Sequence, residues 1–146
     1  MKVMRQTDPV HSPAAFVDAH PEVGTVIDLS KDEPPYQTFE LSQGGVEYVK
    51  GKSKTPPTKV DVKQFIEAVK AAVSRNPAKQ VAVHCHYGYN RTGFMICCYL
   101  IEVCGVPIPD AIEYFAKARP NGIRHTHFKD ELYLRYAPKV RLKGTR

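Results

Sequence analysis

The order of apolar segments along this chain predicts an α/β domain whose central strands run parallel. Short β-branched runs alternate with longer stretches in which apolar residues recur at helical spacing, a pattern typical of strands joined by helical crossovers. The 146 residues amount to about one domain, which can bury roughly two-thirds of its unfolded surface around a single core. We therefore expect one domain over residues 1–146 that ends in a basic tail, residues 139–146.

Two strands and a long loop are expected in the first part of the chain. Residues 23–30 (VGTVIDLS) form a β-branched run, and Val46–Lys50 alternate as a second strand. The segment between them is interrupted by Pro and Gly and is expected to be a loop. Residues 50–58 (KGKSKTPPT) are expected to form another loop.

The middle of the chain predicts a helix, a strand and a second helix. Thr58 and Asp61 are spaced as a capping box, which marks a helix start, and Asn76-Pro77 stops that helix. The apolar residues of this helix recur at helical spacing: Val62, Phe65, Ile66, Val69 and Val73. Residues 80–84 (QVAVH) form a compact apolar strand. Residues 92–104 are apolar on nearly every face, which places their helix in the centre of the domain.

Two further helices are expected near the C-terminus. Pro109 and Asp110 start the first, and residues 119–122 (RPNG) end it. Thr126 is expected to cap the second. The inward-facing residues of the two helices are expected to be Ile112, Phe115, Ala116, Phe128, Leu132 and Tyr136.

Charge and hydropathy narrow the class of protein. No apolar run approaches the roughly 20 residues that span a bilayer, and residues 1–15 lack the apolar stretch of a secretory signal, so we expect an intracellular protein without membrane contact. The net charge is +6, and basic residues concentrate around Lys50–Lys54 and in the tail. Such clusters favour polyanionic partners, although a solvated basic surface explains them equally well.

The four cysteines fall into two groups. Cys97, Cys98 and Cys104 lie in one strongly apolar segment, and we expect them to be reduced core residues. Cys85 instead belongs to residues 84–93 (HCHYGYNRTG), a glycine-containing turn between the predicted strand and the central helix. Such a turn directs backbone N–H groups and a helix dipole toward one point, where an anion binds and a thiolate is stabilised. Cys85 is therefore the candidate nucleophile.

The neighbours of Cys85 fit phosphate chemistry. Arg91 is placed to grip two phosphate oxygens through its planar guanidinium, which lysine does not match. The Thr92 hydroxyl is expected to hydrogen-bond the cysteine sulfur and aid departure of the thiolate. Loop backbone and side chains form the predicted phosphate cradle: His86, Tyr87, Gly88, Tyr89, Asn90 and Arg91. The expected supports of the loop are His84, Asn90 and Gly93.

Two alternatives compete with this interpretation. A zinc site would use His84, Cys85 and His86 with His125 or His127, but adjacent ligands on one tight turn fit tetrahedral coordination poorly. A phosphate-binding module without turnover would keep the same loop and bind its ligand without cleaving it.

HCHYGYNRTG resembles the signature loop of the cysteine phosphatases, in particular the RNA 5′-triphosphatase domains of animal-type mRNA-capping enzymes and their relatives that act on RNA or protein. The resemblance also covers VIDLSKDEPPY, VEYVK with KGKSKTPPT, and AIEYFAKARPNGIRHTHFKDELYLRYA, so that it spans nearly all of residues 8–138, the expected core. It implies a central mixed, mostly parallel twisted sheet with helices on both faces. It also implies a phosphocysteine formed on Cys85, a phosphate clamp by Arg91, and no metal or other cofactor.

One departure from this pattern bears on the substrate. Most members of the superfamily carry an aspartate on a separate loop that protonates the leaving oxygen, and in this branch that loop falls near KGKSKTPPT, which contains no carboxylate. Asp32, Glu33, Asp61 and Asp110 remain as donors that would have to reach the site from elsewhere. A diphosphate leaving group needs little protonation, so a phosphoanhydride substrate is favoured.

The expected function is removal of the terminal phosphate from RNA 5′-triphosphate or a similar polyphosphate. The alternative is a protein tyrosine or dual-specificity phosphatase that uses the same Cys85 and Arg91. Lys52 and Lys54 are candidate substrate contacts because a triphosphate carries extra charge. By resemblance, residues 119–127 (RPNGIRHTH) lie near the rim of the pocket, where Arg124 is a further candidate contact, with surface charge and a helix cap as the alternative.

Overall fold

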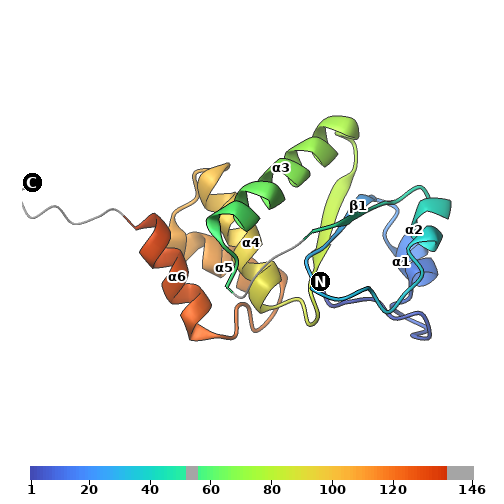
Figure 1. Ribbon diagram of the computed structural model, residues 1–146, viewed down its shortest axis with the longest axis horizontal. Helices are drawn as coiled ribbons and strands as arrows, with labels where there is room; N and C mark the ends of the chain where they lie inside the picture. The colour runs from blue at the N-terminus through green and yellow to red at the C-terminus, as the bar shows by residue number, and fades with distance from the viewer. Residues whose placement is uncertain (52–55, 138–146) are drawn as a thin grey trace, which may run out of the picture.

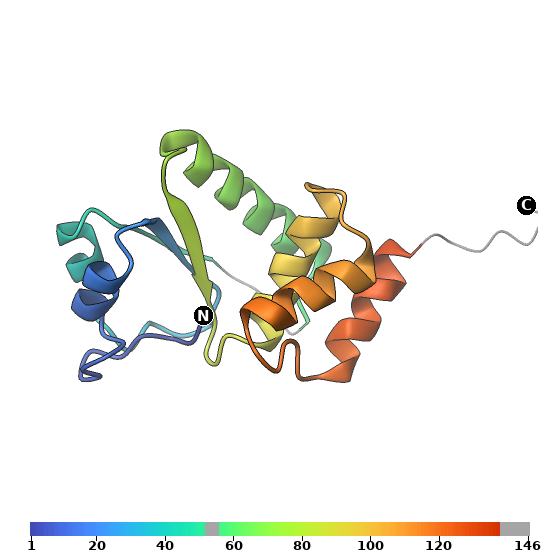
Figure 2. The same cartoon turned by 180° about the vertical axis from the view of Figure 1, so that it is seen from behind.

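The chain folds as a three-layer α/β domain in the computed structural model, which describes residues 1–51 and 56–137. Its elements are α1 Pro13–Ala19, β1 Val23–Asp28, α2 Phe39–Gln43, β2 Glu47–Lys50, α3 Lys59–Arg75, β3 Gln80–His84, α4 Asn90–Glu102, α5 Ile108–Ala118 and α6 Thr126–Tyr136. Figures 1 and 2 show α1 and α2 on one side of the strands, and α3 to α6 on the other. The predicted fold class, with helices on both faces of the sheet, is confirmed.

The sheet has the order β2-β1-β3, and both pairings are parallel. All six residues of the central strand β1 are buried, because helices cover both of its faces. Neighbouring residues point to opposite faces: Val26 and Ala82 pack with α1 and α2, whereas Ile27 and Val83 pack with the larger helical layer. An antiparallel strand, which a mixed sheet would include, is not present in the described ranges.

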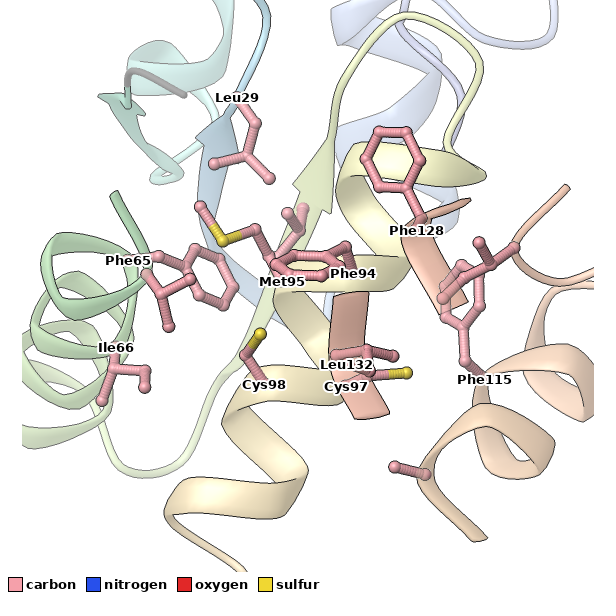
Figure 3. Packing of buried hydrophobic residues seen from close by; sticks show 14 of the residues in the cluster. Leu29, Phe65, Ile66, Phe94, Met95, Cys97, Cys98, Phe115, Phe128 and Leu132 are labelled. Carbon is pink, nitrogen blue, oxygen red and sulfur yellow. The ribbon is translucent and has the colours of Figure 1, made fainter. Parts of the chain in front are cut away.

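The larger core lies between the sheet and the central helix α4. Phe94, Met95, Cys97 and Cys98 of α4 are fully buried. Figure 3 shows Met95 directed toward Phe65 of α3 and Phe94 near Phe128 of α6. The Phe94 and Phe128 rings meet edge to face at 5.9 Å. The prediction that this helix occupies the centre of the domain is confirmed.

Helix α3 begins as the sequence predicts. The Thr58 hydroxyl accepts from the Asp61 N–H at 3.1 Å, and the Asp61 carboxylate accepts from the Thr58 N–H at 2.9 Å, which completes the capping box. Helix α4, however, begins at Asn90, two residues earlier than predicted, so that Arg91 and Thr92 lie in its first turn.

Several local predictions were wrong. The loop expected before β2 contains α2, and α1 was missed although Ser12 caps it and Pro13 opens it; both helices are too short to show a periodic pattern. Cys104 is exposed rather than buried, because α4 ends at Glu102 and Cys104 lies in the following turn. Val73 is 42% exposed, and Ala72 takes the inward position. Thr126 is the first helical residue of α6, and His125 precedes it as the cap, without a side-chain cap bond.

Candidate active site

The carboxyl ends of the three parallel strands converge at one edge of the sheet, where ligands bind in many open α/β folds. Asp28, the last residue of β1, stands in register with Lys50 of β2 and with His84 of β3. Residues 85–89 leave this edge and enter α4 directly. The loop therefore lies between the sheet edge and the N-terminus of a buried helix, where backbone N–H groups attract anions.

Cys85 is 6% exposed at the start of this loop. The Thr92 hydroxyl donates a hydrogen bond to Cys85 Sγ at 3.1 Å. Burial by itself would raise the pKa of the thiol, but the Thr92 hydroxyl, the Thr92 and Gly88 amides and the Arg91 guanidinium together lower this pKa below its ordinary value. The balance favours a thiolate in a largely enclosed position.

Arg91 lies in the first turn of α4 and lines the same hollow as Cys85. Its Nη1 donates to the Leu29 carbonyl at 3.3 Å, just beyond the end of β1. This bond holds the guanidinium near the carboxyl end of β1, where its charge helps to lower the pKa of Cys85.

Arg119 fixes the outer side of the loop. Its Nη2 donates to the Tyr87 carbonyl at 2.7 Å and its Nε donates to the Gly88 carbonyl at 3.4 Å. Its guanidinium also lies 4.3 Å from the centre of the Tyr89 ring. Because Arg119 binds the carbonyl oxygens of Tyr87 and Gly88, these two peptide groups are held in one orientation.

Gly88 is required by the backbone at its position. Its φ is +82°, which favours glycine, and an added Cβ would lie 2.3 Å from the Met1 carbonyl carbon. Gly93 is required by packing, because a Cβ there would lie 2.5 Å from a ring carbon of Phe115. A larger residue at either site would displace the loop or α4.

Asn90 joins the loop to the connection between α5 and α6. Its Oδ1 accepts from the N–H groups of Arg124 and His125, both at 2.9 Å. The Arg124 side chain lies over Tyr89, with 5.4 Å between guanidinium and ring centre. The residues that precede α6 are thereby fastened beside Arg91.

A buried network supports the loop from below. His84 is 0% exposed; its Nδ1 donates to the Cys85 carbonyl at 2.9 Å, which leaves Nε2 to accept from the Tyr36 hydroxyl at 2.7 Å. Burial lowers the pKa of His84, so the ring stays neutral with both nitrogens satisfied. Because neither nitrogen is left for a metal, the zinc alternative loses its first ligand. Among the described residues, no group of three or more His, Cys, Asp or Glu is arranged to hold an ion.

Asp28 lies beside this network, with its Oδ1 3.7 Å from His84 Nδ1, although it carried no signal in the sequence. Its carboxylate is fully buried and accepts from the Ser30 N–H at 2.8 Å, the Tyr48 hydroxyl at 2.6 Å and Lys50 Nζ at 3.3 Å. Burial would raise the pKa of Asp28, but the hydrogen bonds from Ser30 and Tyr48 lower it overall. Neither Tyr36 nor Tyr48 lies near the motif in sequence, so only the fold reveals these partners.

A hollow of about 160 Å³ opens over Cys85, the volume of roughly five water molecules at about 30 Å³ each. Its lining residues are Cys85, His86, Tyr87, Tyr89, Asn90, Arg91, His125 and Phe128. Most of the predicted phosphate-binding residues are therefore brought together, with Gly88 behind them and Arg124 adjacent. Lys52 and Lys54 lie outside the described residues.

No carboxylate lines this hollow in the part of the chain that the structure describes. Asp61 is engaged in the α3 capping box, and Asp110 lies in the first turn of α5. Asp32 and Glu33 are exposed on the segment after β1. The undescribed residues 52–55 and 138–146 contain no Asp or Glu.

Comparison with known families decides the class of this site. Residues 7–137 match the family model of the dual specificity phosphatase, catalytic domain. The chain belongs to the dual specificity phosphatase family. It is a cysteine phosphatase, as the signature loop predicts. No helix in the described ranges has the length and apolar character needed to cross a membrane.

The names of some relatives of this phosphatase refer to RNA, and the names of others refer to protein tyrosine. It is 35% identical over 118 residues to an mRNA-capping enzyme of Danio rerio, covering 79% of this chain and 20% of that protein. It is 33% identical over 121 residues to a tyrosine-protein phosphatase of Autographa californica nuclear polyhedrosis virus, covering 82% and 72%. It is 37% identical over 122 residues to an RNA/RNP complex-1-interacting phosphatase homolog of Caenorhabditis elegans, covering 79% and 52%. The aligned part thus spans about a fifth of the capping enzyme and about half of the nematode protein.

Solved structures support the fold of this phosphatase. The crystal structure of Tk-PTP in the active form has a TM-score of 0.67 at 22% identity and covers 88% of each chain. Human DUSP28 has a TM-score of 0.62 at 19% identity, covering 85% of this chain and 84% of that one. At these identities the similarity concerns the fold alone.

Proposed function

We propose that this phosphatase removes the terminal phosphate from RNA 5′-triphosphate or a similar polyphosphate through a phosphocysteine on Cys85. The observation that carries the choice of substrate is the absence of a carboxylate around the described hollow, which contains a thiol, a guanidinium, imidazoles and aromatic rings. Relatives named mRNA-capping enzyme and RNA/RNP complex-1-interacting phosphatase support RNA as the polyphosphate carrier.

The first step follows from the thiolate and the anion-binding loop. Cys85 Sγ attacks the terminal phosphorus, an S–P bond forms, and the bond to the bridging oxygen breaks, which releases a diphosphate end. Arg91 turns from the Leu29 carbonyl to two equatorial phosphate oxygens, and the loop amides bind the rest of the developing charge. The leaving diphosphate departs as an anion, so the step proceeds without a carboxylic acid.

The second step regenerates the thiol. Water attacks the phosphocysteine, the S–P bond breaks, and the sulfur leaves as a thiolate. The Thr92 hydroxyl, 3.1 Å from Sγ, donates to the sulfur as its charge develops. This is the same contact that lowers the pKa of Cys85 before reaction.

The test compares phosphate release from triphosphate-ended RNA, a phosphotyrosine peptide and an aryl phosphate. We expect the highest kcat/KM on the RNA and no release by Cys85→Ser. Acid-quenched wild type should carry phosphate on the peptide that contains Cys85, as read by mass spectrometry. Faster cleavage of the peptide than of the RNA would refute the polyphosphate assignment.

A second candidate is a protein tyrosine or dual-specificity phosphatase. It is favoured by the viral tyrosine-protein phosphatase, of which this chain covers 72%. In the same assays this candidate predicts strong peptide hydrolysis and weak RNA cleavage. Tight phosphate binding without turnover on any substrate would instead identify a phosphate-binding module.

A further inference from the structure

His125 lines the hollow, comes from a segment separate from the loop, and carries an imidazole, a side chain that can donate a proton to a reacting group. We propose that His125 protonates the leaving oxygen of phosphate monoesters, in place of the carboxylic acid that the hollow lacks. This goes beyond the proposed polyphosphate activity, because it assigns a proton donor for esters, whose alkoxide or phenoxide leaves poorly without a proton.

The fold holds His125 at the mouth of the hollow from three sides. Its backbone N–H donates to Asn90 Oδ1 at 2.9 Å, which fastens it to the residue before Arg91. Its ring stacks on Phe128 with centres 6.2 Å apart and planes at 28°, and its other neighbour is the His127 ring at 5.5 Å. The ring therefore lies at the edge of the hollow on a backbone that Asn90 holds in place.

The turn before His125 packs closely on the first turn of α4. Asn121 and Gly122 both have positive φ, +81° and +56°, and the chain then buries Ile123 beneath the loop. An added Cβ on Gly93 would lie 2.7 Å from Ile123 Cγ1, so the connection packs directly on the first turn of α4. His125 follows two residues later, on the solvent side of the hollow.

The size of the hollow puts His125 within reach of a bound ester. The hollow is small, about 160 Å³, and both Cys85 and His125 line it. A general acid acts at about 2.6–3.2 Å or through one water, and such distances tighten when substrate binds. A side chain that lines so small a hollow meets this requirement with a rotation of its ring.

His86 is the other imidazole of the hollow, but it belongs to the same loop as the nucleophile. The attacking sulfur and the leaving oxygen lie roughly in line through phosphorus, so the donor must come from the side opposite Cys85. His86 follows Cys85 directly in the chain, and its ring packs edge-on against Tyr87 at 4.4 Å. His125 enters from the α5–α6 connection, an independent segment.

The proton balance closes over one turnover. As the S–P bond forms and the P–O bond breaks, the His125 imidazolium gives its proton to the leaving oxygen, and the alcohol or phenol departs. The neutral ring then takes a proton from the water that attacks the phosphocysteine. The S–P bond breaks, phosphate and the thiolate are released, and the imidazolium is restored; the net reaction is ester plus water to alcohol plus phosphate.

The test measures kcat/KM of wild type and His125→Gln on monoesters that share the phosphoryl group but differ in leaving group. For p-nitrophenyl phosphate, whose phenolate leaves readily, we expect little change. For phenyl phosphate and a phosphotyrosine peptide we expect a loss of about 10²-fold, the lower end for general acid catalysis. A plot of log kcat/KM against leaving-group pKa should therefore be steeper for the variant.

His127→Gln is the matched control, since it makes the same change in the same ring stack outside the lining of the hollow. It should keep the wild-type slope. An equal loss by His125→Gln on all three esters would show a structural role and overturn the proposal. A wild-type slope in His125→Gln would also overturn it, as would a steeper slope in His86→Gln instead of His125→Gln. Turnover of p-nitrophenyl phosphate by wild type separates each of these outcomes from failure of Cys85 as nucleophile.

Discussion

The reactivity of Cys85 depends on opposing local effects within a few ångströms of one sulfur. Enclosure disfavours a charged sulfur, while the Thr92 hydroxyl, two backbone amides and Arg91 favour it, and the second group prevails. Cys97 and Cys98 lie in α4, where burial raises the pKa of each thiol to about 12, and at Cys98 it does so against a hydrogen bond from Tyr136 and the nearby charge of Arg135. The pKa values of these three thiols thus differ through their surroundings alone.

Thr92→Val is expected to raise the pKa of Cys85, because it removes the hydroxyl that donates to Sγ at 3.1 Å. A hydrogen bond to a charged group is worth about 1.5–3 kcal/mol, so the alkylation rate should fall roughly tenfold or more at pH values below the wild-type midpoint. The measurement is the rate of iodoacetamide alkylation against pH, in a Cys104→Ser background because Cys104 is exposed. The midpoint should lie below about 8.5 in the parent protein and move upward in the variant. An unmoved midpoint would show that the amides and Arg91 suffice.

Arg91→Lys keeps the charge but loses the planar pair of donors that matches a phosphate. We expect kcat/KM to fall by at least about 10²-fold, the scale seen when one donor to a developing charge is removed. Inhibition by inorganic phosphate should weaken in parallel. Arg75→Lys, the same change at an exposed arginine paired with Glu47, is the control and should leave both unchanged. Near-normal turnover in Arg91→Lys would remove Arg91 from the clamp role.

At the residue scale, the site residues that are close together in the sequence could be predicted from it. HCHYGYNRTG places Cys85, Arg91 and Thr92 within one turn of chain, so their proximity follows from spacing. Tyr36, which bonds His84 across 48 residues, carries no local pattern. Asp28 was expected inside a strand over residues 23–30, and only the parallel register with Lys50 and His84 reveals its place at the sheet edge beneath the loop.

At the scale of elements, helix α4 determines the geometry of the loop through close packing on its neighbours. Gly93 lets Phe115 of α5 and Ile123 approach its first turn. Long elements with a clear period, such as α3 with its capping box, could be predicted from sequence. The short α1 and α2 could not, because seven and five residues show too little periodicity to separate a helix from a loop.

Gly93→Ala should destabilise the protein although alanine favours helix. The new methyl would lie 2.5 Å from Phe115 Cε2 and 2.7 Å from Ile123 Cγ1. Overpacking of this kind costs about 1–3 kcal/mol, more than the roughly 0.5–1 kcal/mol that alanine gains over glycine in a helix. Urea unfolding measures the net free energy of unfolding. Phe115→Leu in the Gly93→Ala background supplies the control, since the smaller side chain should recover part of the loss in a double-mutant cycle. A Gly93→Ala protein as stable as wild type would show that α4 and α5 separate freely.

At the scale of the whole molecule, one buried polar network joins all three strands to the loop. Lys50, Asp28 and His84 end neighbouring strands. Lys50 bonds Asp28, the Asp28 carboxylate lies 3.7 Å from the His84 ring, and His84 bonds Tyr36 and the Cys85 carbonyl. The pKa values of His84 and Asp28 are both lowered. Burial lowers that of His84 and keeps the ring neutral, whereas hydrogen bonds lower that of Asp28 and keep the carboxylate charged although it is buried. The fold that forms the site is therefore sensitive to acid.

The sign of that sensitivity follows from proton binding. As pH falls through about 6.5, His84 in the unfolded chain takes up a proton. His84 in the folded protein stays neutral because its pKa is lowered. The unfolded state then binds more protons, so stability falls on acidification by up to about 1.4 kcal/mol per pH unit for this one group. The lowered pKa of Asp28 adds a second loss below about pH 4, where the unfolded carboxylate is protonated first.

His84→Gln should therefore reduce the dependence of stability on pH between 7.5 and 5.5, whatever it does to stability itself. The measurement is the free energy of unfolding from urea titrations at several pH values in that range. His20→Gln, at an exposed histidine after α1, is the matched control and should keep the wild-type slope. If His84→Gln does not fold, the ring protons of His84 in wild-type protein serve instead, and their NMR shifts should stay constant over the same range. A wild-type slope in the variant, or a ring that titrates near pH 6.5, would show that His84 is charged in the folded protein and that the network beneath Cys85 is held in another way.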